Sequence, residues 1–270
     1  MKRIVIFTGS ELRHDFVRKF IAIDPEIMVA ASFCEGAEKG YRAFVEKQTD
    51  TEMRMKHLIA REQSEKDFFG LFVEDSADKS NPLFLAKGDI NKPQYFDQVV
   101  SLKPDLIIAF GCSIIKEPLL SAFSGRFLNV HLGLSPYYRG SGTNYWPLVN
   151  GEPEFVGATF MHIDPGIDTG EIIHQIRAEI VWGDTPSSIG NRLIKDMTSV
   201  YREIIKKIDH LPKMPQPEKF SGREYRQRDY DEMSVQNLYT HFNNGLVEIY
   251  LKEKRGRCLK APLVSNSGLL

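Results

Sequence analysis

The most constraining feature of this 270-residue chain is a set of short, unbroken apolar runs that end at turn residues. Residues 4–7 read IVIF and residues 106–110 read LIIAF, with no polar residue between the apolar ones. A strand with one wet face alternates apolar and polar residues, so continuous runs are typical of strands buried on both faces. Charged segments of helical length separate them. The pattern predicts an α/β doubly wound, mostly parallel, Rossmann-like sheet.

The expected elements alternate along the chain. We expect strands near 3–9, 26–36, 81–86, 103–111 and 126–133, and two antiparallel strands within 157–180 joined by a polar loop. Helices are expected at 12–23 and 185–208, where Thr185-Pro186 is a helix-start signal. Residues 43–69 are highly charged and predict a long helix or helix pair. A solvated scaffold is the favoured interpretation, and the wall of a ligand pocket or a dimer interface is the alternative.

Two parts of the chain are distinguished by composition. Residues 1–208 contain the alternating strands and helices and are predicted to form the main domain. Residues 209–270 begin with a proline-containing linker, KMPQPEK, and continue with GREYRQRDYDE and a helical stretch, MSVQNLYTHF. We expect this part to be a linker and a small appendage.

Composition limits the class of protein. The net charge is −1 and the pI is about 6.7, so no overall field attracts nucleic acid or anionic membrane. Cys34, Cys112 and Cys258 are widely spaced, which argues against disulfides and a thiolate zinc site and favours a reducing cytosol. No apolar stretch is long enough for a membrane span or a signal peptide. A cytoplasmic protein without a metal site is therefore expected, since the histidines also lack ligand spacing.

Two polar residues interrupt the apolar strand near residue 130. Asn129 and His131 are two apart, so their side chains point to the same face of a strand. Buried polar groups need partners, and these stand where the strand ends. Because ligands of doubly wound sheets bind at the carboxyl ends of the strands, a functional site is favoured there.

Other polar positions leave two readings open. Thr8, Gly9 and Ser10 offer groups for a phosphate at a helix start, or form a tight turn only. Cys112 follows a strand end as a nucleophile would, although a free buried cysteine is usually inert. His162 alternates with Phe160 and is interpreted as structural or exposed.

The loop HIDPGIDTGEII between the two antiparallel strands is rich in turn residues. Asp168 is followed by Thr169 and Gly170, which allow another backbone or a ligand to approach closely. A turn aspartate often bonds only its own backbone. A carboxylate beside a histidine also fixes its tautomer, so the loop and the upstream His131 together favour a function.

These residues resemble a known family. The stretches PDLIIAFG, LNVH, SPYYRG, NGE and GIDTGEII are similar to those of 10-formyltetrahydrofolate-dependent formyltransferases, over residues 1–208 and most densely over 104–175. This group includes the glycinamide ribonucleotide, methionyl-tRNA and amino-sugar enzymes. Gly133 stands where a serine is common and Ser135 where a leucine is common.

The resemblance implies a formyltransferase fold and specific roles. Asn129, His131 and Asp168 match the catalytic trio, with the amide and imidazole aiding an oxyanion and the carboxylate orienting the histidine. The formyl donor, a reduced folate, is expected between the end of the strand near 111–115 and the loop 164–168. The tight turn beside the site leaves both isomers of the Ser135–Pro136 bond open, cis included. The implied donor contacts are Gly111, Ser113, Ile114, Ile115, Asp164, Pro165 and Gly166.

The acceptor is expected to be an amino sugar. The stretch from residue 135 to 160 and the segment GREYRQRDYDE look most like the sugar-acting members, and no strong basic excess follows residue 219. The expected acceptor is anionic or nucleotide-linked and belongs to polysaccharide biosynthesis. Its expected contacts are Ser10, Arg13, His14, Arg139, Asn144 and Tyr145.

Three alternatives stay open: a methionyl-tRNA formyltransferase-like enzyme, a formyltetrahydrofolate hydrolase and a non-catalytic folate- or nucleotide-binding module. The hydrolases are expected to carry a regulatory domain before the first strand, whereas here that strand is predicted to begin at Arg3. A binding module would have no use for a proton shuttle. The sequence leaves the oligomeric state open, a homodimer included.

Overall fold

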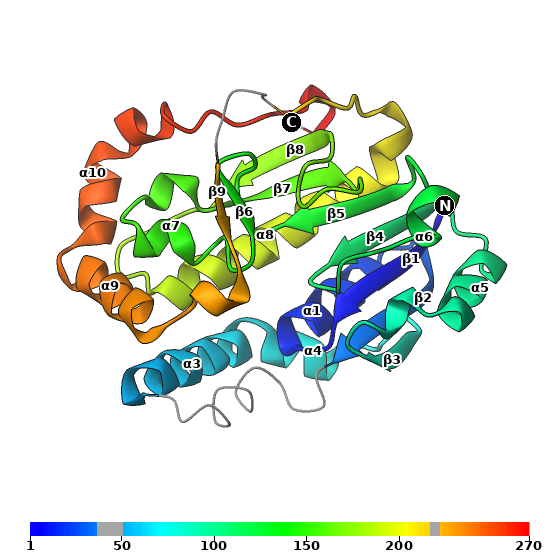
Figure 1. Cartoon of the computed structure of the whole chain (residues 1–270), viewed down its shortest axis with the longest axis horizontal. Coiled ribbons are helices and arrows are strands. Elements are labelled where there is room, and N and C mark those ends of the chain that lie inside the picture. Colours follow the sequence, from blue (N-terminus) through cyan, green and yellow to red (C-terminus); the bar gives the residue numbers. More distant parts are fainter. Residues whose placement is uncertain (37–50, 217–221, 270) are drawn as a thin grey trace.

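A seven-stranded mixed sheet forms the centre of the molecule, in the computed structural model that describes residues 1–36, 51–216 and 222–269 (Figure 1). The strand order is β3-β2-β1-β4-β5-β7-β8. The first five strands in this order are parallel, and β7 pairs antiparallel with both β5 and β8. The strands are β1 (Lys2–Gly9), β2 (Ile27–Gly36), β3 (Pro82–Ala86), β4 (Leu106–Phe110), β5 (Phe127–His131), β7 (Gly157–His162) and β8 (Ile172–Arg177).

Helices cover both faces of this sheet, as the continuous apolar runs predict. All five residues of β4 are buried because one face packs against α1 and α8 and the other against α5 and α6. The helices are α1 (Leu12–Ala22), α3 (Glu52–Glu65), α4 (Leu71–Asp75), α5 (Pro93–Ser101), α6 (Leu119–Ala122), α7 (Trp146–Val149), α8 (Pro186–Lys207), α9 (Glu232–Asn243) and α10 (Leu246–Cys258).

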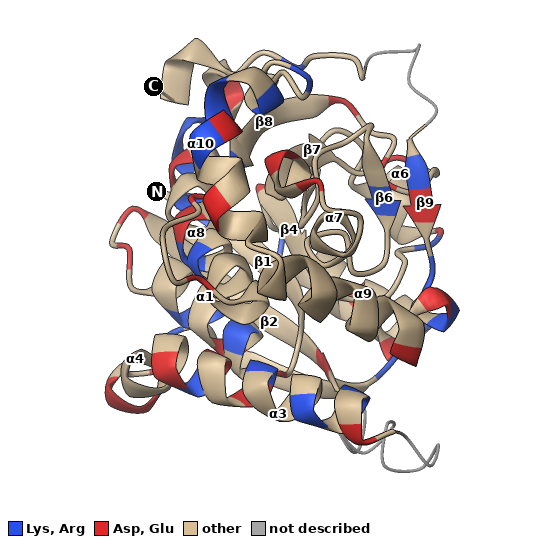
Figure 2. Ribbon diagram, turned by 90° about the vertical axis from the view of Figure 1, so that its left-hand side faces the viewer, with Lys and Arg blue, Asp and Glu red and all other residues tan. Residues whose placement is uncertain are grey.

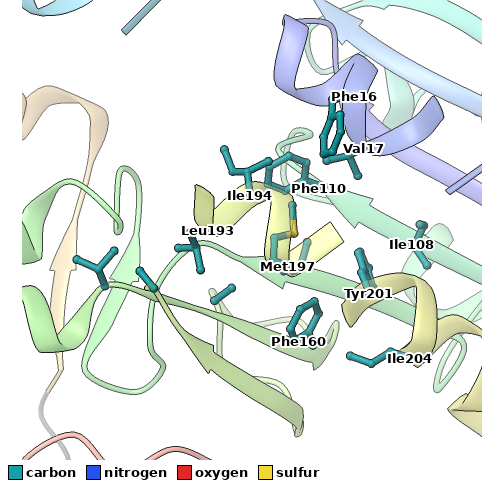
Figure 3. Packing of buried hydrophobic residues seen from close by; sticks show 14 of the residues in the cluster. Phe16, Val17, Ile108, Phe110, Phe160, Leu193, Ile194, Met197, Tyr201 and Ile204 are labelled. Carbon is teal, nitrogen blue, oxygen red and sulfur yellow. The ribbon is translucent and has the colours of Figure 1, made fainter. Parts of the chain in front are cut away.

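Helix α8 contributes the largest apolar stripe. Its buried Leu193, Met197, Tyr201 and Ile204 recur every three or four residues and face the sheet, as Figure 3 shows. The helix begins at a capping box in which the Thr185 hydroxyl accepts a bond from the Ser188 backbone N–H. The predicted helix start at Thr185-Pro186 is thereby confirmed.

The charged stretch 43–69 is helical where the structure describes it. Helix α3 continues through a π-helical turn (Lys66–Gly70) into α4, and residues 43–50 lie outside the described part. Figure 2 shows both acidic and basic residues along α3. However, buried His57 and Leu58 on the same helix face inward. The helix therefore combines a solvated face with a face that packs on the rest of the molecule.

The C-terminal segment packs along the main sheet. Strand β9 (Arg223–Tyr225) pairs in parallel with β6 (Tyr138–Gly140), a two-stranded sheet that the sequence analysis did not predict. Helix α9 contacts α7 and α3, and α10 was also not predicted. Farther on, the Val264 backbone N–H donates to the side chain of Gln175 on β8. The boundary at residue 208 is therefore a change of composition, with extensive contacts across it.

No helix in the described ranges combines the length and the apolar character that a membrane crossing requires.

His57 links α3 to α9 in a nearly closed environment. Its Nδ1 lies 3.1 Å from the Tyr239 hydroxyl, and the rings of Tyr145 and Tyr230 pack beside it. Burial, aided by Arg61, lowers the pKa of His57 from 6.5 to about 4. The histidine is thus neutral in the folded protein at neutral pH.

This lowered pKa makes stability depend on pH. Below pH 6.5 the unfolded chain binds a proton at His57, whereas the folded chain binds one only near pH 4. The contribution is therefore complete above pH 6.5 and falls with acid, with a limit of about 3 kcal/mol.

We expect the unfolding free energy of the wild type to fall by about 2 kcal/mol more than that of His57→Gln when the pH is lowered from 7.5 to 5. Urea unfolding at the two pH values measures the difference. Tyr239→Phe is the matched control, since it removes the hydrogen bond but keeps the burial and should retain the pH dependence. An unchanged pH dependence in His57→Gln would show that this histidine titrates normally in the folded chain.

Candidate active site

A cleft of about 1300 Å³ lies at the carboxyl edge of the parallel strands. Its walls come from the ends of β1, β4 and β5, the loop after β7, the inner side of α3 and residues 224–230. The sheet order reverses between β1 and β4, and such switch points are where doubly wound folds bind ligands. The cleft is therefore where the topology of this fold predicts it.

Asn129, His131 and Asp168 meet in the wall of this cleft. In the β5–β7 ladder Asn129 pairs with Met161 and His131 with Thr159, so the amide and the imidazole lie on one face. The loop after β7 brings the Asp168 Oδ2 to 3.3 Å from His131 Nδ1. The three residues that the sequence analysis singled out are thus brought together.

Both nitrogens of the His131 ring face oxygen atoms. Nδ1 faces the Asp168 carboxylate, and Nε2 lies 3.0 Å from the backbone oxygen of Tyr138. A neutral imidazole has one N–H and can donate to only one of these acceptors. The two oxygens therefore hold the ring in one orientation.

Asp168 is fixed by its backbone as well as by its side chain. Its φ of 53° lies in the left-handed region, which Asp and Asn tolerate better than most residues. Its Oδ2 also accepts the Gly140 backbone N–H at 3.0 Å. The Gln216 side chain donates to the backbone oxygens of Asp168 and Gly170 at 2.8 and 2.9 Å.

Arg139 lies outside the cleft, contrary to the expectation that it contacts the acceptor. It is absent from the lining residues, and its Nη2 donates to Gln216 Oε1 at 2.9 Å. Because Gln216 in turn holds the backbone at Asp168, Arg139 supports the carboxylate loop from behind. The sequence analysis located the residue near the site but assigned it to the wrong partner.

Gly133 makes room for the imidazole. A Cβ at this position would lie 2.5 Å from His131 Nε2 and 2.7 Å from the Thr143 Cβ. Thr143 donates its hydroxyl to the Leu132 backbone oxygen at 2.6 Å and so occupies the adjoining space. Gly133 stands where a serine is common in the family that the sequence resembles, and here Thr143 occupies the space that a side chain at residue 133 would need. The Ser135–Pro136 bond is cis.

One end of the cleft is apolar at its rim. Ile114 and Ile167 are 69% and 50% exposed and stand on the segment after β4 and on the loop after β7. Asp164 accepts bonds from the Gly166 backbone N–H and the Thr169 hydroxyl, which shape that loop. All residues expected to contact the formyl donor line the cleft: Gly111, Ser113, Ile114, Ile115, Asp164, Pro165 and Gly166.

The other end of the cleft is aromatic. Trp146 and Tyr225 stack with ring centroids 4.2 Å apart and an angle of 7°. The Tyr145 ring lies near Tyr230, and its hydroxyl donates to the Ser234 hydroxyl of α9. Aromatic faces and adjacent polar groups suit sugar rings and heterocyclic bases.

Arg13 also lines the cleft but is already paired. Its guanidinium donates to Glu65 at 2.6 Å and forms a second ion pair with Glu11. Burial lowers the pKa of Arg13, and Arg61 lowers it further while the two carboxylates oppose the shift. An incoming anion must therefore compete with carboxylates for this arginine.

His14 stands at the switch point between β1 and β4. A Cβ at Gly9 or Gly111 would lie 2.5 Å or 2.4 Å from its ring, so both positions require glycine. Burial, followed by Arg13 and Arg61, lowers the pKa of His14 well below its ordinary value. Its Nδ1 accepts the Glu11 backbone N–H, so the neutral ring carries its proton on Nε2.

The remaining candidates are inert or structural. Burial, aided by the nearby Glu35 carboxylate, raises the pKa of Cys112 to about 12, so its thiol stays protonated. His162 is buried, and burial lowers its pKa to about 4. No cluster of metal-ligating side chains occurs within the residues that the structure describes. Ser10 and Asn144 line the cleft.

Sequence reasoning missed several cleft residues. Those on α3 were hidden because a charged helix gives no signal for the side that it buries. Those near 225 were hidden because the pairing of β9 with β6 joins residues far apart in the chain. The missed residues include Glu11, Glu35, His57, Arg61, Glu65, Trp146, Tyr225 and Tyr230.

Comparison with known proteins adds independent information. Methionyl-tRNA formyltransferase of Acetivibrio thermocellus is 32% identical over 149 residues, 54% of this chain and 47% of that protein. The chain spans about half the length of the curated relatives that it matches.

Solved structures share the fold at low identity. A sugar N-formyltransferase from Shewanella sp. FDAARGOS_354 has a TM-score of 0.55 at 13% identity and covers 87% of each chain. Phosphoribosylglycinamide formyltransferase of Anaplasma phagocytophilum has a TM-score of 0.55 at 16% identity, over 84% of this chain and 98% of that one. A family model described as formyl transferase matches residues 49–205, more than half of the chain. This protein therefore belongs to the formyl transferase family.

Proposed function

We propose that this chain is an N-formyltransferase that moves a formyl group from 10-formyltetrahydrofolate to the amine of an amino sugar. The observation that carries the proposal is the meeting of Asn129, His131 and Asp168 between an apolar and an aromatic end of one cleft. The acceptor would be anionic or nucleotide-linked and would serve glycan or surface-polysaccharide biosynthesis.

The reaction needs one bond exchange and one proton transfer. The acceptor nitrogen forms a bond to the formyl carbon, and the bond from that carbon to the donor nitrogen breaks. A proton leaves the acceptor nitrogen, and one reaches the donor nitrogen, so the products are a formamide and tetrahydrofolate. An oxyanion forms on the formyl oxygen before the second bond breaks.

The trio supplies groups for each of these needs. The Asn129 amide donates an N–H to the oxyanion, and the His131 ring lies beside it. Asp168 stabilises that ring through the 3.3 Å contact to Nδ1. The His131–Asp168 pair relays the proton from the acceptor nitrogen toward the donor nitrogen.

The apolar end of the cleft fits the formyl donor. Ile114 and Ile167 offer exposed apolar surface to a flat heterocycle, and the loop 163–170 offers backbone polar groups to its edge. Gly111 has a φ of +69° and passes close to His14, so the backbone approaches the cleft without a side chain. These features agree with a reduced folate in this half of the cleft.

The aromatic end fits the acceptor. Tyr145, Trp146, Tyr225 and Tyr230 present rings suited to a sugar or a base, while Asn144 offers hydrogen bonds. Ser10, Arg13 and His14 complete this side. We propose residues 1–208 as the catalytic domain and residues 209–270 as an appendage that contributes part of the acceptor wall.

The second candidate is a methionyl-tRNA formyltransferase-like activity, favoured by the identity of the sequence relatives. A hydrolase would use water instead of an amine, and a binding module would transfer nothing. Incubation with 10-formyltetrahydrofolate and a panel of nucleotide-linked amino sugars, methionyl-tRNA or buffer separates these possibilities. Mass spectrometry that shows one added formyl group on an amino sugar alone supports the proposal, whereas formylated methionyl-tRNA supports the second candidate.

We expect His131→Ala and Asp168→Asn each to lower kcat by on the order of a hundredfold or more, with little change in melting temperature. Asparagine tolerates the left-handed backbone at residue 168, so this variant removes the charge and keeps the loop. Stopped assays with the accepted amino sugar measure kcat, and circular dichroism checks the fold. Turnover near that of the wild type in either variant would refute the assignment.

Variants of Arg139 and Asn144 should distinguish a residue that holds the Asp168 loop from one that binds the acceptor. We expect Asn144→Ala to raise the KM of the acceptor about tenfold, because a bond to the ligand is lost. Arg139→Ala should instead lower kcat up to about tenfold and leave both KM values nearly unchanged, since it loosens Gln216 behind Asp168. If Arg139→Ala raised only the acceptor KM, the arginine would belong to the acceptor pocket.

A further inference from the structure

The wall of the donor end includes a segment without regular secondary structure, residues 113–116, between β4 and α6. A segment outside helices and strands has no ladder of backbone bonds to fix it. Its two isoleucines nevertheless take opposite positions, with Ile114 69% exposed at the rim and Ile115 7% exposed in the core. Other contacts must therefore fix this part of the backbone.

Glu35, the penultimate residue of β2, makes one set of these contacts. Its Oε2 accepts the Ser113 backbone N–H at 2.7 Å. Its Oε1 accepts the backbone N–H groups of Gly88 and Ile90 at 2.9 and 3.2 Å. One carboxylate thus ties the segment after β4 to the turn after β3.

Asn91 makes the second set. It ends the short 3₁₀ helix Asp89–Asn91, which follows that turn. Its Nδ2 donates to the Ile114 backbone oxygen at 3.0 Å, and its Oδ1 accepts the Lys116 backbone N–H at 2.8 Å. The two side chains therefore bond the segment at Ser113, Ile114 and Lys116.

The chemistry of Glu35 suits this task and few others. The residue is 6% exposed, and a buried charge is costly unless hydrogen bonds compensate it. Backbone N–H groups supply that compensation, and bonds to a charged acceptor are stronger than neutral ones. A glutamine would keep one acceptor and turn an N–H toward another N–H, so it cannot bond both loops equally well.

We propose that Glu35 and Asn91 are positioning residues that fix the donor-binding segment 113–116, and that the affinity for the reduced folate depends on them. The inference rests on the proposed function for the identity of the ligand. Neither residue acts on the formyl group, so both are distinct from the catalytic trio. Their effect is to hold Ile114 at the rim and the backbone of Ser113 in the cleft wall.

The test uses the whole chain and 5-formyltetrahydrofolate as a stable probe. We expect Glu35→Gln and Asn91→Ala each to weaken binding in calorimetry by about tenfold or more. The double variant should weaken binding by less than the product of the two factors, because both residues serve one segment. Asp105→Asn is the matched control, since Asp105 also accepts a backbone N–H, that of Arg3, but belongs to the opposite edge of the sheet.

Hydrogen exchange distinguishes the positioning role from the ligand. The amides of Gly88, Ile90 and Ser113 should lose protection in Glu35→Gln, without any ligand, while those in β1 and β4 keep it. Unchanged protection, or unchanged binding with lost protection, would overturn the inference. A wild-type protein that binds no folate probe would overturn the proposed donor, and the exchange pattern would still decide whether Glu35 fixes these loops.

Discussion

The contact between His131 and Asp168 is the interaction on which the rest of the site depends. It joins the end of a central strand to a loop that leaves the sheet and returns, so it requires both the β5–β7 register and the turn at Asp168. Two groups bond Asp168 directly, the Gly140 backbone N–H and the Gln216 side chain. Arg139 in turn donates to Gln216. Such support is what a carboxylate needs if it is to meet an imidazole at a fixed distance.

The two ends of the cleft compensate buried charge in different ways. At the proposed donor end Glu35 is compensated by backbone N–H groups, which cannot move without moving the chain. At the proposed acceptor end Arg13 is compensated by the side chains of Glu11 and Glu65, which can rotate. The first arrangement favours a rigid wall for a constant ligand. The second can exchange partners when a charged ligand arrives.

The sequence predicted the sheet and the trio for physical reasons. Unbroken apolar runs have few alternatives to strands buried on both faces, and Asn129 and His131 stood out because they interrupt one. Asp168 was singled out because its loop combines a carboxylate with small residues and because His131 lies upstream. The apolar runs and their interruption are local signals that can be read from a short window of sequence, whereas the loop alone left a plain turn open.

The features that the sequence analysis assigned wrongly or missed depend on partners that lie far away in the sequence. Arg139 was assigned to the acceptor because nothing nearby in the sequence revealed Gln216 as its partner. For helix α3 the choice between a solvated scaffold and a pocket wall stayed open, because charges on its outer face conceal His57 on the inner one. Tyr225 was missed because its strand pairs with residues far back in the chain. Long-range partners, unlike periodicity, leave no mark in a single sequence.

The cleft is formed partly inside and partly outside the stretch that matches the family. The trio and most of the donor wall lie within residues 49–205, the part that matches the formyl transferase family, whereas Tyr225 and Tyr230 lie beyond it. A catalytic geometry that serves many acceptors must be combined with a wall that selects one. Here that wall joins α3 to the segment around β9, and His57 contacts both Tyr230 and α9 across the gap between them. A change in either element alters the shape of this end of the cleft while β5 and its trio stay in place. Under the proposed function, the acceptor can therefore diverge within this fold without change to the chemistry.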